Sequence, residues 1–250
     1  MTERIRSRNK DDKSKPIKAV VLAGGLGTRL RPFTLLLPKP MLAVGNKPIM
    51  EHIIDWLKAN GINDVVIATG YLGRTIEAYF GDGKDFGVNI EYARSDRPLG
   101  HAGQLKSAEG LLTETFVCLY GDAILEFDLK EVIKFHQKKD PLITMTLMRH
   151  ETQTKYGVIE TDSDGRLSEW KEKPVLAGDI NVGCYVVQKK FLDYIPPGKV
   201  YGMKEAFESA IQDKKLVCAL KVKGTFTDIG DKRAYKEADQ AYIERYGKIP

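Results

Sequence analysis

The amino-acid sequence predicts an α/β fold: a Rossmann-like mixed, mostly parallel sheet with helices on both faces and an antiparallel β extension. In the first half of the chain, short β-branched apolar segments alternate with segments whose apolar residues recur at helical spacing. This alternation is typical of a parallel sheet whose ligands bind at the carboxyl ends of its strands. In the second half, strand-like segments follow one another with short turns between them, which favours antiparallel pairing.

The first half predicts four strands and four helices. The helix over 48–60 starts at Pro48 and is followed by Gly61, residues that suit the two ends of a helix. Asp128 is a suitable N-cap for a helix over 129–139. Two more helices are expected around Ile76 and over 101–112. Buried strands are expected at 18–23, 64–70, 88–93 and 116–122.

The second half predicts strands at 142–150, 156–162, 167–173 and 181–188, all as an extension of the same sheet. Two helices, around Ala206 and over 232–246, follow them. Trp56 and Trp170 are interpreted as packing residues. No internal repeat or linker interrupts the chain, so we expect residues 17–250 to form a single domain.

The composition restricts the class of protein. The chain is 42% hydrophobic and 29% charged, which is typical of a protein with a buried core. No apolar run could span a bilayer and no secretory signal is evident, so a cytoplasmic protein without a membrane partner is expected. The three cysteines are scattered and form no zinc or redox motif.

The net charge of +5 comes largely from the N-terminal segment. Residues 1–16 are basic and polar, which predicts a disordered tail. Because the rest of the chain is close to neutral, no nucleic-acid partner is expected, and binding of nucleic acid through the tail is the rival that a tail deletion would test.

Residues 19–41, AVVLAGGLGTRLRPFTLLLPKPM, carry the strongest functional signal. Glycines at the end of a strand let backbone N–H groups form a concave anion site. Arg29 and Arg31 add guanidinium groups, which suit phosphate because they donate two parallel hydrogen bonds. Lys39 adds a charge between Pro38 and Pro40. Together these residues predict a site for a polyphosphate, most simply a triphosphate.

Other interpretations of this segment fit less well. No Gly-Lys-Ser/Thr follows, so the loop is not a P-loop. Leu30 stands where a dinucleotide fingerprint has its third glycine, which argues against a nicotinamide-dependent oxidoreductase. A glycine-rich turn with solvated basic residues would explain a lone Gly-Gly-x-Gly, but not the whole segment.

The segment resembles the signature GGxGTRLxPxTxxxPKP of sugar-1-phosphate nucleotidylyltransferases. Further matches follow in the expected order along nearly the whole chain after the tail: PLGHAG at 98–103, GD at 121–122, YGV at 156–158, EKP at 172–174, NVGCY at 181–185 and TDIGD at 227–231. The resemblance implies the nucleotide-diphospho-sugar transferase type of fold. It also implies transfer of a nucleotidyl group from a nucleoside triphosphate to a sugar 1-phosphate, with release of pyrophosphate.

The resemblance implies roles for individual residues. Asp122 and Asp228 would hold Mg²⁺, and Arg29, Lys39, Lys173 and Asp122 would be the catalytic groups. Asp122 ends a buried apolar strand, and two carboxylates with phosphate oxygens and water are a common Mg²⁺ site. The nucleotide would contact Leu22, Ala23, Gly24, Gly25, Gly27, Thr28, Arg29 and Gly100. The sugar phosphate would contact Tyr156, Gly157, Glu172, Lys173, Asn181 and Gly183.

PLGHAG and TDIGDKRAYKEA resemble mannose-1-phosphate guanylyltransferases and heptose-phosphate enzymes, so GTP and mannose 1-phosphate are the expected pair. A glucose-1-phosphate thymidylyl- or uridylyltransferase is the alternative. A non-catalytic regulatory subunit of the same fold is a further rival, against which the presence of Arg29, Lys39 and both aspartates argues. The sequence leaves open whether the chain forms a homo-oligomer.

Overall fold

The computed structural model describes residues 16–247. The predicted tail, apart from Pro16, lies outside the described residues. Its disorder and the single-domain assignment of 17–250 therefore stay predictions.

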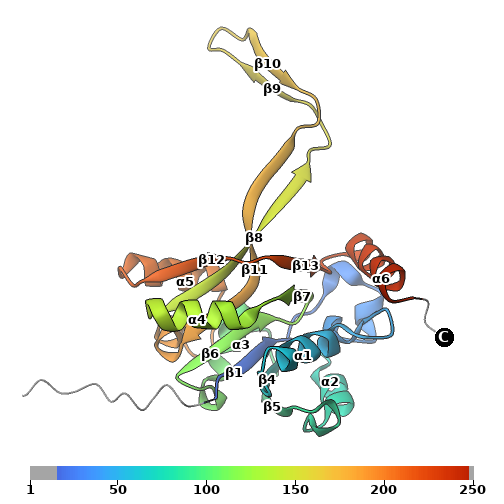
Figure 1. Cartoon of the computed structure of the whole chain (residues 1–250), viewed down its shortest axis with the longest axis vertical. Coiled ribbons are helices and arrows are strands. Elements are labelled where there is room, and N and C mark those ends of the chain that lie inside the picture. The colour runs from blue at the N-terminus through green and yellow to red at the C-terminus, as the bar shows by residue number, and fades with distance from the viewer. Residues whose placement is uncertain (1–15, 248–250) are drawn as a thin grey trace, which may run out of the picture.

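A seven-stranded mixed sheet forms the centre of the structure (Figure 1). Its order is β12–β8–β11–β6–β1–β4–β5, and β6, β1, β4 and β5 pair in parallel. β11 runs antiparallel to both β6 and β8, while β12 is parallel to β8. The sheet is thus mixed and mostly parallel, as predicted. Its strands are β1 (Lys18–Leu22), β4 (Asp64–Thr69), β5 (Asn89–Arg94), β6 (Thr115–Tyr120), β8 (Ile143–Gln153), β11 (Val175–Gln188) and β12 (Val217–Lys221).

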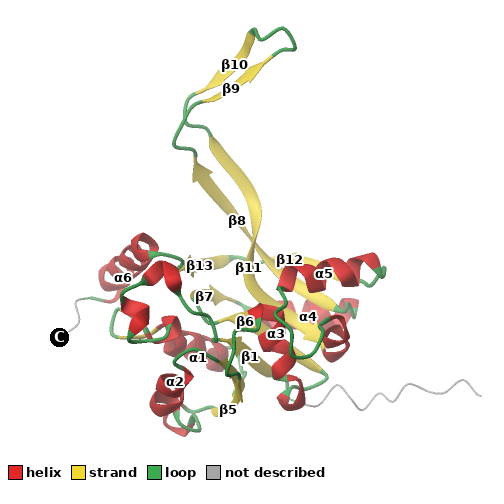
Figure 2. Ribbon diagram, turned by 180° about the vertical axis from the view of Figure 1, so that it is seen from behind, coloured by secondary structure: helices red, strands yellow, loops and turns green. Residues whose placement is uncertain are grey.

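Helices cover both faces of this sheet (Figure 2). Side chains of β1 alternate between two cores: Ala19 and Val21 belong to one, Val20 and Leu22 to the other. The first core includes residues of α1, α2 and α4, and the second includes residues of α3 and α5. The helices are α1 (Ile49–Ala59), α2 (Gly73–Phe80), α3 (Gly100–Ser107), α4 (Leu129–Lys139), α5 (Met203–Gln212) and α6 (Lys232–Tyr246).

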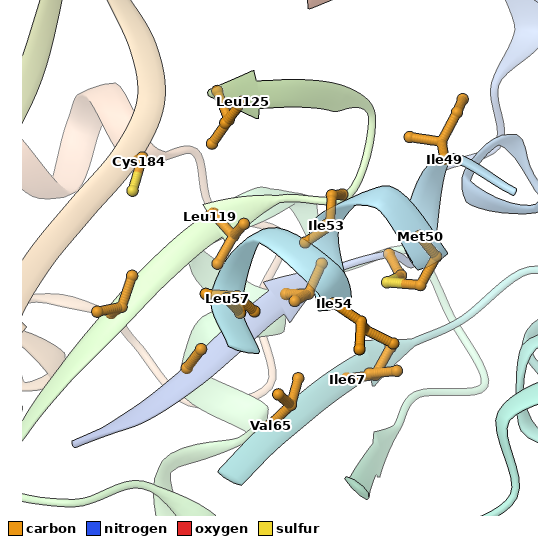
Figure 3. Close-up of a cluster of buried hydrophobic side chains, with 14 of the residues drawn as sticks. Ile49, Met50, Ile53, Ile54, Leu57, Val65, Ile67, Leu119, Leu125 and Cys184 are labelled. Atoms are coloured by element: carbon orange, nitrogen blue, oxygen red, sulfur yellow. The ribbon is translucent and has the colours of Figure 1, made fainter. Parts of the chain in front are cut away.

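Helix α1 shows how the apolar pattern fixes packing. Ile49, Ile53 and Leu57 recur at helical spacing and are buried against the sheet (Figure 3). Beneath them lie Val65 of β4 and Leu119 of β6. The periodicity that predicted this helix is therefore the periodicity of its buried face.

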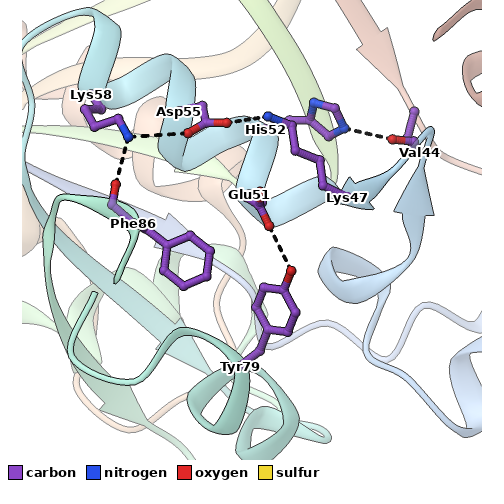
Figure 4. A network of polar contacts seen from close by, with 8 residues as sticks. All are labelled: Val44, Lys47, Glu51, His52, Asp55, Lys58, Tyr79 and Phe86. Atoms are coloured by element: carbon purple, nitrogen blue, oxygen red, sulfur yellow. Dashed lines mark hydrogen bonds and ion pairs between the residues drawn. The ribbon is translucent and has the colours of Figure 1, made fainter. Parts of the chain in front are cut away.

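Polar contacts tie the other side of α1 to neighbouring loops (Figure 4). His52 Nε2 lies 2.9 Å from the carbonyl oxygen of Val44, and Lys47 forms an ion pair with Asp55. Val44 and Lys47 belong to a small hairpin of β2 (Ala43–Val44) and β3 (Lys47–Pro48). These contacts anchor the long connection from β1 to α1, which carries most of the charged residues of the predicted phosphate site.

The remaining strands form two more two-stranded sheets. β7 (Ala123–Phe127) pairs antiparallel with β13 (Gly224–Asp228), so Asp228 is the last residue of a strand. β9 (Val158–Thr161) pairs with β10 (Leu167–Lys171). The prediction that these last two strands extend the main sheet is wrong, because they pair only with each other.

β9 and β10 lie at the end of a projection that we call the arm, residues 149–181 (Figures 1 and 2). The outer parts of β8 and β11 pair with each other from Arg149–Asp179 to Gln153–Val175 and lead away from the helices. Side chains along the arm are exposed or half-buried throughout. Trp170 is 61% exposed, so its assignment as a packing residue is wrong, whereas Trp56 packs on Phe127.

Candidate functional site

A pocket of 230 Å³ opens where β1 and β6 end side by side. The two strand ends are joined by a hydrogen bond in which Gly121 N–H donates to the Leu22 carbonyl at 2.9 Å. This is the carboxyl edge of the parallel part of the sheet, where ligands of such folds bind. The structure brings eight predicted residues together around this pocket: Leu22, Ala23, Gly25, Gly27, Thr28, Arg29, Lys39 and Asp122.

The glycine-rich loop forms one wall. Gly27 has a left-handed backbone with φ of 60°, and its carbonyl accepts a 2.8 Å hydrogen bond from the Thr34 hydroxyl. A Cβ atom at Gly27 would lie 2.8 Å from the Thr34 methyl, closer than real contacts allow. Gly27 is therefore required both by conformation and by space. The buried Thr34, which the sequence did not single out, holds the turn closed.

The loop presents backbone donors to the pocket. The N–H groups of residues 25–29 make no hydrogen bond to any other residue in the described part of the chain. Unpaired amides in succession suit an anion. The Gly24 amide is an exception to the predicted set of free donors, because it donates to Gln104 Oε1 at 2.9 Å.

Lys39 lies between two prolines in a short 3₁₀ turn and is 8% exposed. Its Nζ donates to Asp122 Oδ2 at 2.8 Å. A buried ammonium requires a partner, and this contact provides it from the end of β6. The pair therefore links the loop after β1 to the carboxylate after β6.

The strand pairing of β13 with β7 places Asp228 beside Asp122. Asp228 pairs with Ala123, the residue after Asp122, and Ile229 N–H donates to the Asp122 carbonyl at 3.3 Å. Burial raises the pKa of Asp228; the charge of Asp122 raises it further, while Lys39 and Arg29 oppose the rise. A Cβ on Gly230 would lie 2.9 Å from Asp228 Oδ2 and 3.4 Å from Arg29 Nη1, so these two side chains flank the same glycine.

The donor set of this site fits a hard divalent cation. Mg²⁺ is commonly held by one or two protein carboxylates, with phosphate oxygens and water completing its coordination. Asp122 and Asp228 supply two carboxylates from adjacent strands. No group of three or more His, Cys, Asp or Glu side chains suited to a metal occurs among residues 16–247. The two carboxylates would therefore need ligand atoms from substrate and solvent.

Two aromatic side chains of the pocket were not predicted as site residues. His101 stacks on Tyr120 with ring centroids 4.5 Å apart, and both line the pocket. Burial lowers the pKa of His101, which favours the neutral imidazole. His101 lies within the PLGHAG motif, and this position in a motif was the only feature of the sequence that indicated a role for His101. Tyr120 is the last residue of β6, and nothing in the sequence indicated that it belongs to the site.

Gly24 and Gly100 lie outside the lining of this pocket. Gly24 lines a separate hollow of 310 Å³ with Leu26, Gly70 and residues 95–98. Gly100 begins α3 with φ of 69°, and a Cβ there would lie 2.5 Å from the Tyr201 carbonyl oxygen. The left-handed backbone and the close approach of Tyr201 therefore explain why residue 100 is a glycine. Gly100 lies two residues after Pro98, which lines the hollow.

Asn181 and Gly183 lie at the root of the arm, behind Tyr120. Asn181 donates to the Tyr185 hydroxyl at 2.7 Å, and that hydroxyl donates to the Tyr120 hydroxyl at 3.2 Å. The Gly183 N–H donates to Asn181 Oδ1 at 3.0 Å. Asn181 and Gly183 therefore contact the pocket through its tyrosine wall.

The other predicted sugar-side residues are not brought to the pocket. Tyr156, Gly157, Glu172 and Lys173 are all on the arm, and none of them lines the pocket. Glu172 accepts a hydrogen bond from Trp170 Nε1 at 3.2 Å. Lys173 has φ of 43°, a conformation that costs a non-glycine residue about 1 kcal/mol and that is found more often at functional sites.

A larger cavity of 560 Å³ lies elsewhere, between α1, α6 and the β7–β13 pair. Its walls include Trp56, Ala238 and Tyr242, and it contains none of the predicted site residues. It is therefore not the site that the sequence predicts. In the described residues, every helix is too short or too polar to cross a lipid bilayer.

Named relatives cover most of the chain. It is 33% identical over 248 residues to a UTP–glucose-1-phosphate uridylyltransferase of Synechocystis sp., with 92% of this chain and 64% of the relative aligned. It is 36% identical over 201 residues to a mannose-1-phosphate guanylyltransferase of Mycobacterium tuberculosis, with 79% and 56% aligned. The chain thus spans less than two thirds of the length of these two relatives.

Solved structures share the fold. A putative glucose-1-phosphate thymidylyltransferase from Bacillus anthracis, in complex with a sucrose, superposes with a TM-score of 0.74 at 24% identity, covering 94% of this chain and 97% of the other. HddC from Yersinia pseudotuberculosis, complexed with GMP-PN, gives a TM-score of 0.71 at 25% identity, covering 90% and 99%. The family model described as "Nucleotidyl transferase" matches residues 18–245. With this match over most of its length, the chain belongs to the nucleotidyl transferase family.

Proposed function

We propose that the protein transfers a nucleotidyl group from a nucleoside triphosphate to a sugar 1-phosphate, forming a nucleotide-sugar and pyrophosphate. The observation that carries the proposal is the pocket at the ends of β1 and β6. The glycine loop, Arg29, Lys39 and Asp122 line it, and Asp228 lies next to Gly230, which lines it as well. A site with this balance of charges suits a polyphosphate bound together with a cation.

The reaction follows from charge and position. An oxygen of the sugar phosphate attacks the α-phosphorus of the triphosphate, the bond from that phosphorus to the bridging oxygen breaks, and pyrophosphate leaves with the electron pair. Phosphoryl-type transfer depends mainly on positioning and electrostatic stabilisation. The loop amides, Arg29 and Lys39 would hold the β- and γ-phosphates and offset charge on the leaving group. Lys173 would orient the attacking phosphate.

A cation completes the proposed site. Asp122 and Asp228 would hold Mg²⁺, which when bound neutralises charge on the reacting phosphates. The base and ribose would lie along Leu22, Ala23 and Gly24, next to the hollow lined by residues 95–98.

Direct transfer agrees with the thiols near the site. Cys118 and Cys184 are buried, and burial raises the pKa of both, that of Cys184 to about 12. A buried protonated thiol is a poor nucleophile. The proposed mechanism therefore uses neither of these thiols as a nucleophile.

For the substrates we propose GTP and mannose 1-phosphate, supported by the Mycobacterium tuberculosis relative at 36% identity. The Synechocystis relative, aligned over 92% of this chain, favours glucose 1-phosphate with UTP as the alternative. A cytoplasmic location without nucleic-acid partners remains part of the proposal.

An assay of pyrophosphate release tests both the proposed activity and the proposed substrates. Each common nucleoside triphosphate is combined with mannose, glucose and heptose 1-phosphates, with and without Mg²⁺. The expected result is Mg²⁺-dependent release that is fastest with GTP and mannose 1-phosphate. A faster reaction with another pair would replace the substrate assignment, and no release with any pair would overturn the enzymatic function.

A further inference from the structure

The starting observation is that the proposed site is divided between two parts of the molecule. The phosphate-binding groups line the pocket at the ends of β1 and β6, whereas Lys173, Glu172 and Tyr156 are on the arm. Seven residues of extended β11, Val175 to Asn181, separate Lys173 from the root of the arm. The six steps between the first and the last, at about 3.3 Å each, span roughly 20 Å. A lysine side chain is too short to cross that distance back to Asp122.

The arm is built as a continuation of the sheet. The β8–β11 ladder runs from Ile143–Val187 to Gln153–Val175 and shifts register only between Asn181 and Tyr185. Thr154 N–H then donates to the Pro174 carbonyl at 3.0 Å, which closes the ribbon at its outer end. We call the described residues outside the arm, 16–148 and 182–247, the body. Folding the arm back onto the body of the same chain would require breaking part of this ladder.

The β9–β10 end of the arm has two different faces. Lys171 pairs with Glu169 and Glu160 on one of them. The register places Ile159 opposite Trp170 and Leu167 opposite Thr161 on the other. Ile159, Leu167 and Trp170 are about half exposed or more. A two-stranded ribbon is marginally stable alone, so an uncovered apolar face on such a ribbon indicates a partner surface.

The body has an apolar surface next to the phosphate pocket. Residues 33–37 belong to the connection that joins the glycine loop to Lys39. Phe33, Leu35, Leu36 and Leu37 are exposed on it, Leu36 by 81%. An apolar ribbon and an apolar loop beside an incomplete site are complementary surfaces, and every copy of the chain carries both.

We infer that the arm of one chain docks on the body of a second copy and supplies Lys173 and Glu172 to that copy's site. Exchange of identical elements between protomers is a low-cost route to association, because no new surface has to arise. Each site would then contain the glycine loop, Lys39 and both aspartates of one chain, with the sugar-phosphate residues of the other. The inference rests on the proposed function, since it uses the proposed role of Lys173.

Subunit complementation tests this exchange. Asp122→Asn, with a defective body, and Lys173→Ala, with a defective arm, are each expected to be inactive. When the two are co-expressed with different tags, random mixing should leave about a quarter of the sites with an intact body and an intact arm, and so restore about a quarter of wild-type activity. Folding of each variant is checked by nucleotide binding to Lys173→Ala and by thermal unfolding of both.

Two variants of the body provide the matched control. Asp122→Asn co-expressed with Lys39→Ala should give no recovery, because every body is then defective whichever arm it receives. Recovery in that control, or none in the Asp122→Asn and Lys173→Ala mixture, would overturn the exchange and place the arm on its own body.

Association state gives a readout that does not depend on catalysis. Sedimentation equilibrium of the wild type should detect oligomers, and the double variant Ile159→Ser and Trp170→Ser should raise their dissociation constant at least tenfold. Lys171→Ala, on the ion-paired face of the arm, should leave it within a factor of about two. A wild type that stays monomeric at all concentrations would overturn the inference. An arm-dependent oligomer without transferase activity would instead overturn the proposed function and keep the docking.

Discussion

At the residue scale, the proposed chemistry depends on two carboxylates that come from distant parts of the sequence. Asp122 pairs with Lys39 at 2.8 Å, and Asp228 lies beside Arg29 over Gly230. Each acid therefore has a cationic neighbour, and burial raises the pKa of Asp228. Such an arrangement suits acids that share a cation with a phosphate substrate better than acids in simple surface ion pairs.

Substitution of either acid tests this arrangement. Asp122→Asn and Asp228→Asn keep the side-chain shape but remove the charge, so kcat should fall about 100-fold or more, as when electrostatic stabilisation is lost in other enzymes. The thermal unfolding temperature should change little. Asp64→Asn, at the start of β4 and the opposite edge of the sheet, is the control and should keep wild-type kcat. Full activity in both test variants would exclude the metal assignment.

A buried histidine away from the site makes a prediction about stability. His136 is 2% exposed; its Nδ1 contacts the Thr144 hydroxyl at 2.9 Å, and its Nε2 makes no hydrogen bond within residues 16–247. Burial lowers the pKa of His136 from 6.5 to about 4. Between these two values the unfolded chain binds a proton that the folded chain does not, so stability is lost as the pH falls below 6.5.

This loss should amount to about 2 kcal/mol between pH 7 and pH 5, since each pKa unit corresponds to about 1.4 kcal/mol. Urea unfolding of the wild type and His136→Gln at the two pH values measures it, and the variant should have the shallower pH dependence. His150→Gln removes an exposed histidine and should retain the wild-type slope. Equal slopes for wild type and His136→Gln would contradict the prediction.

At the scale of elements, the irregularity in β11 determines where the arm leaves the sheet. Gly183 has φ of 73°, and a Cβ there would lie 2.5 Å from the Tyr120 ring. Before this point β11 pairs only with β8, and after it with both β8 and β6. The glycine thus allows the strand to bend and the pocket tyrosine to pack against it.

Gly183→Ala should therefore cost about 1–3 kcal/mol in stability, from backbone strain and from displacement of Tyr120. It should also raise the KM for the sugar phosphate, because Tyr120 forms a pocket wall. Gly178→Ala is the matched control on the same strand: a Cβ there meets nothing within 4 Å, so stability and KM should stay near wild type. Urea unfolding and steady-state kinetics of both variants measure the difference. If Gly183→Ala had the stability and the KM of the wild type, the bend in β11 would not require a glycine.

At the scale of the whole molecule, the body carries the proposed nucleotide site and the arm carries the proposed sugar-phosphate residues Glu172 and Lys173. Gln153 and Val175 are directly paired, so residues 154–174 can be replaced by an Asn-Gly turn that closes the ribbon in register. The body cores contain no residue of the excised segment. We expect the shortened protein to fold and bind the nucleotide with near wild-type affinity, and to lose transfer to the sugar phosphate by a factor of 100 or more.

Isothermal titration with a non-hydrolysable triphosphate and the pyrophosphate assay test this excision. As a control, replacing Asp164 by Asn at the tip of the arm should leave both measurements unchanged. Transfer at the wild-type rate without the arm would remove Lys173 and Glu172 from the proposed site.

Most of the regular elements were predictable, because their signals are local. α1, α4 with its Asp128 cap, α6 and the four parallel strands lie within a few residues of the predicted ranges. The helix expected over 101–112 ends earlier, at Ser107, and continues as a 3₁₀ turn over 109–111. The β2–β3 hairpin was missed because its strands have two residues each, too few to carry a periodicity. β7 and β12 were also missed.

Sequence alone determined the glycine loop, its cationic neighbours and the position of the pocket at the strand ends, because glycine, proline and apolar spacing act on the backbone over a few residues. Only the tertiary structure decided that Gln104 takes the Gly24 amide, that Asp228 meets Asp122, and that Lys173 lies on an arm instead of at the pocket. These relations depend on which distant strands pair and where a ladder ends. Such choices are made by the free energy of the whole fold, and no local residue pattern specifies them.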